Sequence, residues 1–509
     1  MPLVPRRRER GRAPRSTGPS LAPIGRLSNP WPPLEILSAE QVDRILDGAF
    51  RILEEVGLEI RSASARDYYR RAGALVDDAS QMVRMGRDIV EAQLAHAPEH
   101  FVLHSRDPAR HLHVGGNIVN FGPVSGAPNI SDMEGGRRYG DLEGFRNILR
   151  LTHTLGVLHW QGGIVVEPVD IPVPVRHLAI FKAHIEYADI VWAARGVGGL
   201  QAEDAIAMSA IEHGCTIEEL AARPTLLTVT NVNSPRRVDE EILECIMVLA
   251  RHGQCVVITP FTLMGAMAPV TLAGALVQQT AEALGVITLC QLVRPGAPCV
   301  MGAFTSNVDM RTGSPAFGTP EYVHAVIASA QIGRRLKLPV RSSGVNASPA
   351  VDAQSTYETA FSLQAAVLSH SHLINHACGW LEGGLTASLE KIVVDAELLR
   401  NWAAILKPVQ FSDDDLAVEA IKDIPVGGHF FGSAHTLARY ETAFYRPLLS
   451  DWSNFENWTD AGSRNATQRA TALWKKLLAE YVAPQLDAAV KEALEAFVAR
   501  RTAEIARSG

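Results

Sequence analysis

The sequence lacks the signatures of several common protein classes. Its 509 residues contain only six cysteines, none spaced as CxxC, and the net charge of -7 leaves no basic excess. Cysteines scattered through apolar runs indicate reduced core residues of a cytoplasmic protein. A nucleic-acid partner would require a basic face, so the charge balance argues against one.

Motifs for nucleotide binding and for hydrolases are missing as well. Neither GxxxxGK[ST] nor a GxSxG turn occurs, and no GxGxxG follows the first expected strand. These absences argue against nucleotide binding and against α/β-hydrolase chemistry. Because most of the expected strands carry no lysine, a Schiff-base aldolase has little support either.

One long uncharged run extends from Cys255 to Ala281, and its length alone would suffice to cross a membrane. Pro260, Gly265 and Pro269 interrupt this run, and threonines are scattered through it. The run therefore predicts a buried strand, a loop and the start of a buried helix. No membrane association is expected.

Residues 1–37 are predicted to form a disordered basic arm. Seven arginines lie among prolines and glycines in this segment. No apolar segment follows them, as it would in a secretory signal. A segment of this composition cannot bury enough apolar surface to fold. A targeting role is the alternative interpretation.

From about residue 115, short apolar runs alternate with helical patterns, which predicts an α/β fold. Eight strands and eight helices in alternation are the numbers of a (β/α)8 barrel of the TIM type, with a doubly wound open sheet as the alternative. The expected strands are 118–122, 161–166, 189–194, 225–230, 255–259, 299–304, 339–343 and 373–378. The expected helices begin near residues 141, 173, 201, 237, 271, 320, 353 and 388.

Two regions flank the predicted barrel, which covers 115–405. Ser38 and Gln41 resemble a capping box ahead of an apolar-periodic run, and they predict an N-terminal, mainly helical subdomain over 38–114. Residues 406–509 are predicted to add a loop and helices that pack on the barrel.

A barrel of this type carries its active site at the carboxyl ends of its strands. Asn231, Phe261 and Phe304 lie at the ends of the expected fourth, fifth and sixth strands. Asn346 follows the seventh strand, and the chain then leads into Asp352. We expect these side chains to gather at one mouth.

The segment after the eighth strand is the most suggestive of a pocket. Trp380 and Glu382 lie there between glycines. An aromatic side chain and an acidic one are poorly suited to a tight turn and well suited to line a pocket. Aromatic faces and nearby carboxylates hold a quaternary ammonium ion, which has no N–H to donate.

A second candidate is the loop 427–436, which contains His429 and His435. Two histidines at this spacing match neither HExxH nor a zinc finger. No tightly bound metal is therefore expected, and the loop is predicted to form a lid or wall over the barrel mouth.

Five segments, in this order, resemble the trimethylamine methyltransferase family. The resemblance runs from about residue 38 to residue 500. The segments are Gly265–Gly274 (GAMAPVTLAG), Gln291–Pro298 (QLVRPGAP), Asp352–Gln354 with Glu358, Leu381–Ser388 (LEGGLTAS) with Asp395, and Gly428–Thr436 (GHFFGSAHT).

The resemblance implies an α/β barrel that passes a methyl group from a methylated amine to a corrinoid (cobalamin) protein. Family members without pyrrolysine resemble glycine betaine methyltransferases, which favours a quaternary amine as substrate. Its cofactor would be the corrinoid that the partner protein supplies. A homo-oligomer is consistent with a barrel of this size.

Roles for individual residues follow as hypotheses from the resemblance and the strand ends. A cage for the ammonium group and polar groups that orient the substrate are assigned to Trp380, Tyr357, Phe261, Phe304, Asn346 and Asn231. Charge balance, orientation and the shape of the mouth are assigned to Glu382, Asp352, Gln354, His429 and His435.

Three alternatives stay open at this point. A metal-dependent lyase or hydrolase on the same barrel would use His429 and His435 with nearby acids. A non-catalytic protein would bind a betaine without demethylating it. Methyl transfer to tetrahydrofolate would dispense with the corrinoid protein.

Overall fold

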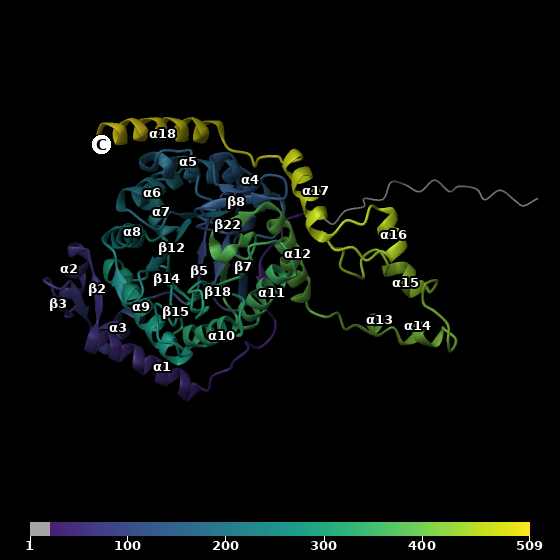
Figure 1. The fold of residues 1–509 in the computed structure, drawn as a ribbon, viewed down its shortest axis with the longest axis horizontal. Helices are drawn as coiled ribbons and strands as arrows, with labels where there is room; N and C mark the ends of the chain where they lie inside the picture. The colour runs from purple at the N-terminus through teal and green to yellow at the C-terminus, as the bar shows by residue number, and fades with distance from the viewer. Residues whose placement is uncertain (1–20, 509) are drawn as a thin grey trace, which may run out of the picture.

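A curled sheet of nine strands lies at the centre of the computed structural model, which describes residues 21–508 (Figure 1). Eight of these strands run parallel, and from β10 to β20 consecutive ones along the chain are neighbours in the sheet. They are β7 (Ile118–Phe121), β10 (Trp160–Gln161), β11 (Val191–Ala194), β12 (Leu226–Val232), β14 (Cys255–Pro260), β16 (Cys299–Gly302), β19 (Val340–Ser343) and β20 (Leu373–Asn375). The eight strands expected from the sequence are all present.

The two ends of this row of strands approach one another. β20 pairs in parallel with β7, so the last strand along the chain lies beside the first. On the other side of β7, the backbone N–H of His159, just before β10, donates to the carbonyl oxygen of Phe121 at 2.9 Å. The protein is thus a mixed α/β structure with a curled sheet, an arrangement compatible with a TIM-type barrel.

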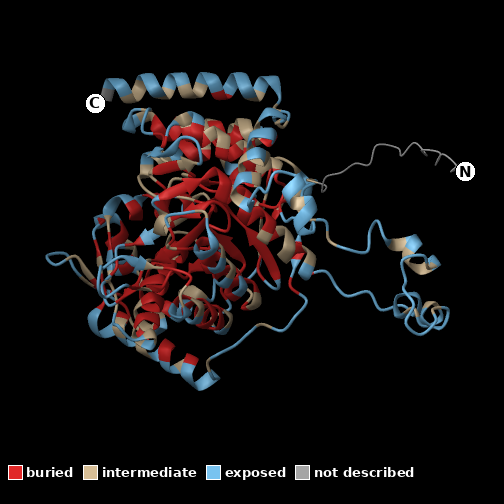
Figure 2. Ribbon diagram, turned by 45° about the vertical axis from the view of Figure 1, so that its right-hand side comes forward, coloured by how far each residue is buried: buried red, intermediate tan, exposed pale blue. Residues whose placement is uncertain are grey.

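Helices follow the strands and cover the outside of the sheet, so that the core lies between them (Figure 2). Each begins within three residues of its expected start. They are α4 (Leu142–Thr154), α5 (Val173–Tyr187), α6 (Gly199–His213), α8 (Glu240–Arg251), α9 (Leu272–Val293), α10 (Pro320–Arg335), α11 (Ala353–Leu368) and α12 (Leu389–Ile405), with a short α7 (Ile217–Ala222) after α6.

Two strands are shorter than their apolar runs predict. β10 stops at Gln161 because two glycines follow it, and glycine weakens a strand interior. β20 stops at Asn375 because His376 adopts a left-handed backbone with φ 54°. Both interruptions occur at the carboxyl ends, where the chain leaves the sheet to form loops.

The uncharged run from Cys255 folds as β14, a short β15 (Leu263–Met264) and the start of α9, as expected. By length and composition α9 could cross a membrane, yet 72% of its most apolar window is buried inside the protein. It packs against α1, α3 and α8 and against the sheet. α9 is therefore built as a core helix.

The N-terminal region wraps the sheet from below in Figure 1. Residues 21–37 fall within the segment predicted as a disordered arm, but they lie along the sheet, and β1 (Leu27–Ser28) pairs antiparallel with β7; residues 1–20 lie outside the described residues. Helices over 38–114 alternate with short strands. The elements are α1 (Ala39–Arg51), a π turn (Ile52–Val56), β2 (Leu58–Ile60), α2 (Ala63–Arg71), β3 (Leu75–Asp77), β4 (Met82–Arg84), α3 (Arg87–Leu94), β5 (Phe101–Leu103), a 3₁₀ turn (Pro108–Arg110) and β6 (Leu112–Val114).

The Ser38 capping box is present at the start of α1. The amide of Gln41 donates to Ser38 Oγ at 3.2 Å, and Gln41 Oε1 accepts from the Ser38 amide at 2.8 Å. Two otherwise unpaired N–H groups are satisfied in this way.

Small sheets rise from the loops at the carboxyl ends of the strands. One joins segments that follow β7 and β20, and another joins segments that follow β14 and β16. They consist of β8 (Asn129–Asp132), β9 (Gly136–Tyr139), β21 (Trp380–Leu381) and β22 (Thr386–Ser388), and of β15, β17 (Ser306–Val308) and β18 (Pro315–Ala316). A short β13 (Arg237–Val238) pairs instead with β2 of the N-terminal region. The first two sheets make walls around the mouth.

The C-terminal region divides into helices that pack and a segment that projects. α17 (Ala466–Ala479) packs on α12 and α4, and α18 (Ala488–Ser508) lies across α5 and α6 (Figure 1). Between α12 and α17 the chain leaves the body, and Figure 2 shows this projecting part mostly exposed. Its helices are α13 (Asp413–Leu416), α14 (Val418–Lys422), α15 (Ala434–Arg439) and α16 (Phe455–Asp460).

Candidate active site

A cavity of about 570 Å³ opens at the carboxyl ends of the parallel strands. Each of the eight strands, or the loop that follows it, contributes to the lining. This position is the usual one for the active site of a parallel α/β fold, and the volume suits a small organic ligand. The lining residues are Ser125, Gly126, Trp160, Gly162–Ile164, Ala193–Val197, Val229, Asn231, Asn233, Ile242, Phe261, Phe304, Arg341, Asn375, His376, Trp380 and Gly383–Leu385.

Aromatic rings form one wall of this cavity. Phe304 lies 5.1 Å from Phe261 and 6.4 Å from Trp380, ring centre to ring centre. The imidazole of His376 lies 4.0 Å from the Trp380 ring, and Trp160 contributes a further ring from β10. Phe304 and Trp380 are 8% and 5% exposed, so their faces are fixed by the packing around them.

Buried polar groups hold Trp380 in place. Its indole N–H donates to the carbonyl oxygen of Asn346 at 3.1 Å, and the Asn346 side-chain amide donates to the Trp380 carbonyl at 2.6 Å. The preceding turn is fixed as well, because the amide of Gly379 donates to Asp395 Oδ2 at 2.9 Å. Asp395 forms a buried ion pair with Lys391, and burial raises the pKa of the Asp395 carboxyl.

The guanidinium of Arg341 lies at the floor of the cavity on β19. It is 1% exposed and lies 5.0 Å above the ring of Phe304. Among the described residues, its Nε and Nη1 have no hydrogen-bond partner, and Nη2 lies 3.5 Å from His376 Nδ1. Burial lowers the pKa of Arg341 to about 10, so the group is still charged at neutral pH. A charge buried without a partner costs several kcal/mol, which favours an anion beside it.

His376 completes the polar side of the cavity. Its Nδ1 lies 3.1 Å from Ser343 Oγ, whose hydroxyl can donate to it, and this arrangement favours the proton on Nε2. Burial, with a smaller contribution from Arg341, holds the pKa of His376 well below its usual range. The imidazole is therefore neutral, with Nδ1 as the acceptor beside the guanidinium and the N–H on Nε2. Asn375 Oδ1 is a further buried polar atom without a partner among the described residues.

The lining is notable for its charges. Among the described residues, it contains the guanidinium groups of Arg341 and Arg195 but neither aspartate nor glutamate. A ligand that carries only positive charge would meet no compensating acid there. A ligand with an anionic end and a cationic end would match the arginine and the aromatic wall at once.

The structure places Trp380, Phe261, Phe304 and Asn231 in the lining of this cavity, as their positions at strand ends predict. Asn231 is exposed at the end of β12. Asn346 is completely buried behind the wall, where it supports Trp380 instead of facing a ligand.

Asp352 and Gln354 belong to the first turn of α11 and do not line the cavity. Asp352 is the N-cap and accepts from the Ser355 amide at 3.1 Å. Gln354 donates to Glu358 at 2.9 Å, and the other oxygen of Glu358 accepts from the amides of Ala347 and Ser348. These residues fix the loop after β19, so their roles in the structure are capping and bracing.

Glu382 lies beside the cavity rim with its charge already paired. Its Oε2 accepts from Thr386 Oγ1 at 2.6 Å and from Arg137 Nε at 2.8 Å. Burial raises its pKa, but these two hydrogen bonds outweigh burial and hold the pKa of Glu382 below its usual range. The hypothesis that Glu382 balances a bound ammonium ion therefore finds no free carboxylate at this position.

Three other predicted residues lie away from the cavity. Tyr357 is 51% exposed on the outer face of α11, where its ring is 6.3 Å from that of Phe361. It is exposed because α11 turns the opposite side to the sheet. His429 and His435 lie on the projecting segment beyond α12, and His435 Nε2 is 3.3 Å from the carbonyl oxygen of Asp414. Neither histidine covers the mouth of its own chain.

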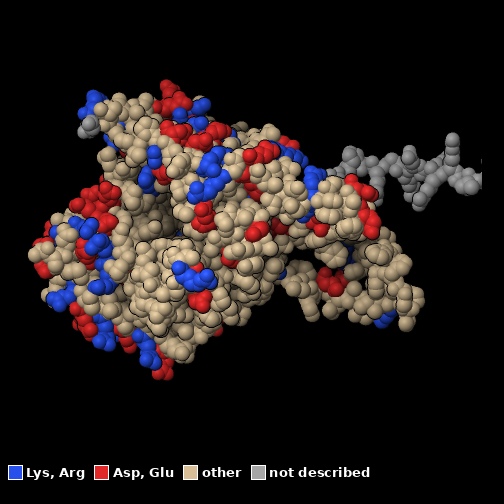
Figure 3. All heavy atoms as spheres, viewed as in Figure 1, with Lys and Arg blue, Asp and Glu red and all other residues tan. Residues whose placement is uncertain are grey.

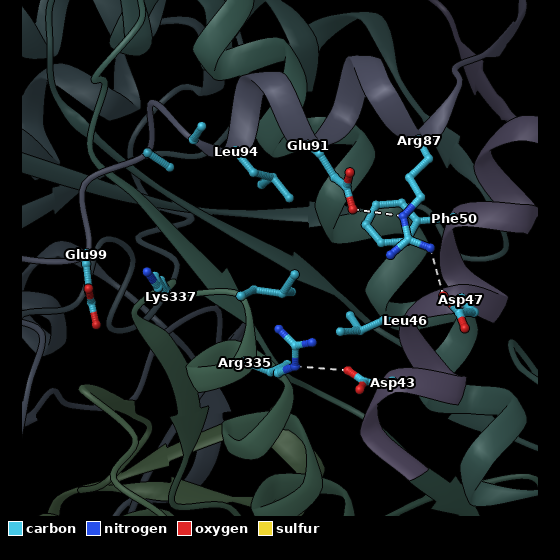
Figure 4. A pocket seen from close by; sticks show the side chains of 13 residues that line it. Asp43, Leu46, Asp47, Phe50, Arg87, Glu91, Leu94, Glu99, Arg335 and Lys337 are labelled. Atoms are coloured by element: carbon cyan, nitrogen blue, oxygen red, sulfur yellow. Dashed lines mark hydrogen bonds and ion pairs between the residues drawn. The ribbon is translucent and has the colours of Figure 1, made fainter. Parts of the chain in front are cut away.

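A separate hollow lies between α1, α3 and the end of α10 (Figure 4). Five of its seven charged side chains pair with each other. Arg87 bonds Asp47 and Glu91, both at 2.8 Å, and Arg335 bonds Asp43 at 2.9 Å. The charges of these five residues are balanced within the chain.

Sequence reasoning missed Arg341 and His376. Each had a signal, since an arginine inside the buried strand 339–343 and a histidine inside the run 373–378 both interrupt apolar sequence. Charged residues are almost never fully buried unless paired, so an isolated one in a core strand indicates a site.

Comparison with known proteins connects this site to a family. The sequence profile of the trimethylamine methyltransferase (MTTB) family matches residues 5–506. The chain is 35% identical over 475 residues to a glycine betaine methyltransferase of Desulfitobacterium hafniense, covering 93% of this chain and 98% of that protein. It is 28% identical over 469 residues to a trimethylamine methyltransferase of the same species, covering 91% and 92%.

Among solved structures, the monomethylamine methyltransferase of Methanosarcina barkeri superposes with a TM-score of 0.47 at 11% identity, covering 87% of this chain and 93% of that chain. The whole-length matches in sequence are decisive. The chain belongs to the trimethylamine methyltransferase family.

Proposed function

We propose that this methyltransferase takes a methyl group from a quaternary amine that also bears a carboxylate, such as glycine betaine, and transfers it to the corrinoid of a partner protein in the cytoplasm. The observation that carries the proposal is the buried guanidinium of Arg341 beside an aromatic wall, whose Nε and Nη1 have no partner among the described residues. The 35% identity to a glycine betaine methyltransferase supports the same substrate class.

Both ends of such a substrate find a counterpart in the cavity. The carboxylate would accept from the Nε and Nη1 of Arg341, which have no partner among the described residues. The ammonium group would then lie against Trp380 and Phe304, since a cation is attracted to the face of an aromatic ring. This pose uses the free N–H groups of the floor and the rings of the wall together.

The same pose accounts for the missing acid. The substrate's own carboxylate neutralises Arg341, so no protein carboxylate is needed to balance the charge of the pocket. A cation without a carboxylate, such as choline, would leave the guanidinium unpaired and add a second positive charge. We therefore infer discrimination in favour of betaines.

The chemistry requires little from acids and bases. The C–N bond to the methyl group breaks, both bonding electrons remain on nitrogen, and a neutral tertiary amine leaves without needing a proton. The electron pair for the new bond to carbon comes from the acceptor. The protein's residues orient the ammonium group, exclude water and present one methyl group towards the mouth.

The corrinoid would be a second substrate that supplies a nucleophilic metal when its protein docks. The outer lining fits a broad, flat group, because backbone replaces side chains at Gly162, Gly163, Gly383 and Gly384. A side chain at Gly384 would collide with Trp380, since an added Cβ would lie 2.5 Å from the indole ring. We also propose that the curled sheet closes between β7 and β10 as a (β/α)8 barrel, with this mouth at its carboxyl end.

The test is demethylation with free cob(I)alamin, followed by the absorbance of the methylated product. Glycine betaine, choline and trimethylamine are compared at equal concentrations, with a carboxylate-bearing homologue such as carnitine included. Turnover is expected with betaines and not with the other two amines. Equal turnover of choline and glycine betaine would show that Arg341 does not select the substrate.

A further inference from the structure

The projecting segment 409–464, called the arm below, is mostly exposed (Figure 2), and many of its apolar side chains are exposed with it. Thirteen of its large hydrophobic side chains are exposed in the described chain, among them Phe411 at 80%, Phe431 at 84% and Phe455 at 72%. Figure 3 shows that most of its visible face carries neither basic nor acidic groups. A soluble surface does not normally gather apolar groups in this way.

The arm is nevertheless a built part of the fold. The segment in which the chain returns to the body is fixed there, because the amides of Leu448 and Leu449 donate to Glu397 Oε2 on α12 at 2.6 and 2.9 Å. Within the arm, Asp414 forms an ion pair with Arg439, which links α13 to α15. The polar groups are thus satisfied internally while the apolar ones face outward.

The exposed area is that of a stable protein interface. An aromatic side chain buries roughly 150–250 Å² when fully covered, so the arm leaves on the order of 1,000 Å² of apolar surface in water. Monomers rarely expose patches above a few hundred Å². A specific complex buries about 800 Å² on each partner, so the arm alone could supply one side of an interface.

The body of the same chain carries a second unpartnered apolar surface, called the α11 strip below. Tyr357 and Phe361 stand one helical turn apart on the outer face of α11, both 51% exposed. Trp31 and Leu34, 41% and 42% exposed, continue the strip at the other end of the helix, where the Leu34 amide donates to the Leu368 carbonyl at 2.8 Å. The strip lies on the outer wall, away from the cavity.

We propose that the arm of one copy of this chain packs on the α11 strip of a second copy. Both surfaces belong to every chain, and a symmetric assembly would cover each with the other. A corrinoid partner fits the arm less well, because a protein that must dissociate after each methyl transfer uses a smaller, more polar interface. A large apolar interface is typical of a permanent complex, such as one between copies of the same chain.

The test is the size of the full-length protein by light scattering, with three single variants. Phe431→Asp alters the arm, Phe361→Asp alters the α11 strip, and Leu75→Asp is the control, since Leu75 is 63% exposed on β3 of the N-terminal region. The unaltered protein and the control should be oligomeric at micromolar concentration. The arm and strip variants should each dissociate at concentrations about 100-fold higher or more, since a buried hot-spot residue dominates an interface.

Mixing the two variants tests whether arm and strip touch each other. In a mixed assembly one arm–strip contact is intact, so the mixture should associate at concentrations where each variant alone is monomeric. Association of both variants like the unaltered protein, or dissociation without rescue on mixing, would overturn the proposal. So would a monomeric unaltered protein, including one whose arm binds only the corrinoid partner. These sizes are measured without turnover, so the result is independent of the substrate proposal.

Discussion

The cavity and the arm are both rich in aromatic side chains, yet they place them in opposite environments. Phe304 and Trp380 are 8% and 5% exposed in the cavity wall, whereas Phe411 and Phe431 are 80% and 84% exposed in the arm. In the cavity, neighbouring groups of the same chain fix each ring. In the arm, Phe411 and Phe431 lie in loops next to short helices, with their rings exposed. The aromatic side chains of the cavity are covered within one chain, whereas those of the arm need a neighbouring chain to cover them.

The largest effect should come from the buried ion pair behind the cavity wall. Asp395→Asn would leave the Lys391 ammonium without a counter-charge in a fully buried position. Removing one partner of such a pair costs about 3–5 kcal/mol, so we expect a corresponding fall in the free energy of unfolding, measured by urea denaturation.

The arm offers the matched control for this experiment. Asp414→Asn removes one partner of the exposed pair with Arg439, and exposed pairs contribute little. We expect no measurable loss of stability from it. A combined Lys391→Met and Asp395→Asn variant should recover most of the loss. Equal effects of the two single asparagine variants would contradict the distinction between the regions.

The next largest effect concerns substrate binding. Arg341→Met should raise the Kd for glycine betaine about 100-fold or more, because a hydrogen bond to a charged group contributes about 1.5–3 kcal/mol and the carboxylate would lose more than one. Thermal stability should hold or rise, since an unpaired buried charge disappears. Calorimetric titration and a thermal melt measure the two quantities.

The same variant should leave the oligomer size unchanged, and Phe431→Asp should leave the Kd unchanged. This pair of results would show that substrate binding depends on the cavity and oligomer formation on the arm, each independently of the other. An unaltered Kd in Arg341→Met would mean that the carboxylate binds elsewhere in the cavity.

The positions of the strands could be predicted from the sequence because core strands are continuous apolar runs and their helices begin at capping residues. Phe261, Phe304 and Trp380 could be placed at the mouth for the same reason, since residues that directly follow parallel strands lie at the carboxyl end of the barrel. Arg341 could not be assigned a role, because pattern alone does not distinguish a paired core arginine from a free one.

The positions of Tyr357 and His429 could not be predicted for a different reason. Sequence distance from a strand end does not tell which face of α11 a side chain takes, and Tyr357 is on the outer one. The loop with His429 was predicted to cover the mouth, but α12 directs the chain away from the body (Figure 1). Such long-range geometry depends on packing between helices, and the local pattern does not contain it.

Lowering the pH should reduce the free energy of unfolding by a smaller amount. The amide of Val340 donates to His372 Nδ1 at 2.9 Å, and burial lowers the pKa of His372 to about 4. Below pH 6.5 the unfolded chain binds a proton at this residue that the folded chain does not. The free energy of unfolding should therefore fall by about 1.4 kcal/mol per pH unit between pH 6.5 and 4.

Denaturation at pH 6 and pH 5 measures this slope. His372→Asn keeps an acceptor for the Val340 amide but cannot titrate, so its slope should be smaller by about that amount. An unchanged slope in His372→Asn would place the proton uptake at another residue.

The smallest effect is expected at the rim. Glu382 already bonds Arg137 and Thr386, so its carboxylate does not face the substrate. Glu382→Gln keeps the shape and one acceptor oxygen, and kcat/KM for glycine betaine should change by less than about 5-fold, because an exposed ion pair contributes about 1 kcal/mol at most. Trp380→Leu is the contrasting variant, since it removes a ring that faces the cavity. If Glu382→Gln abolished turnover while Trp380→Leu did not, the ammonium group would lie against the rim and not against the aromatic wall.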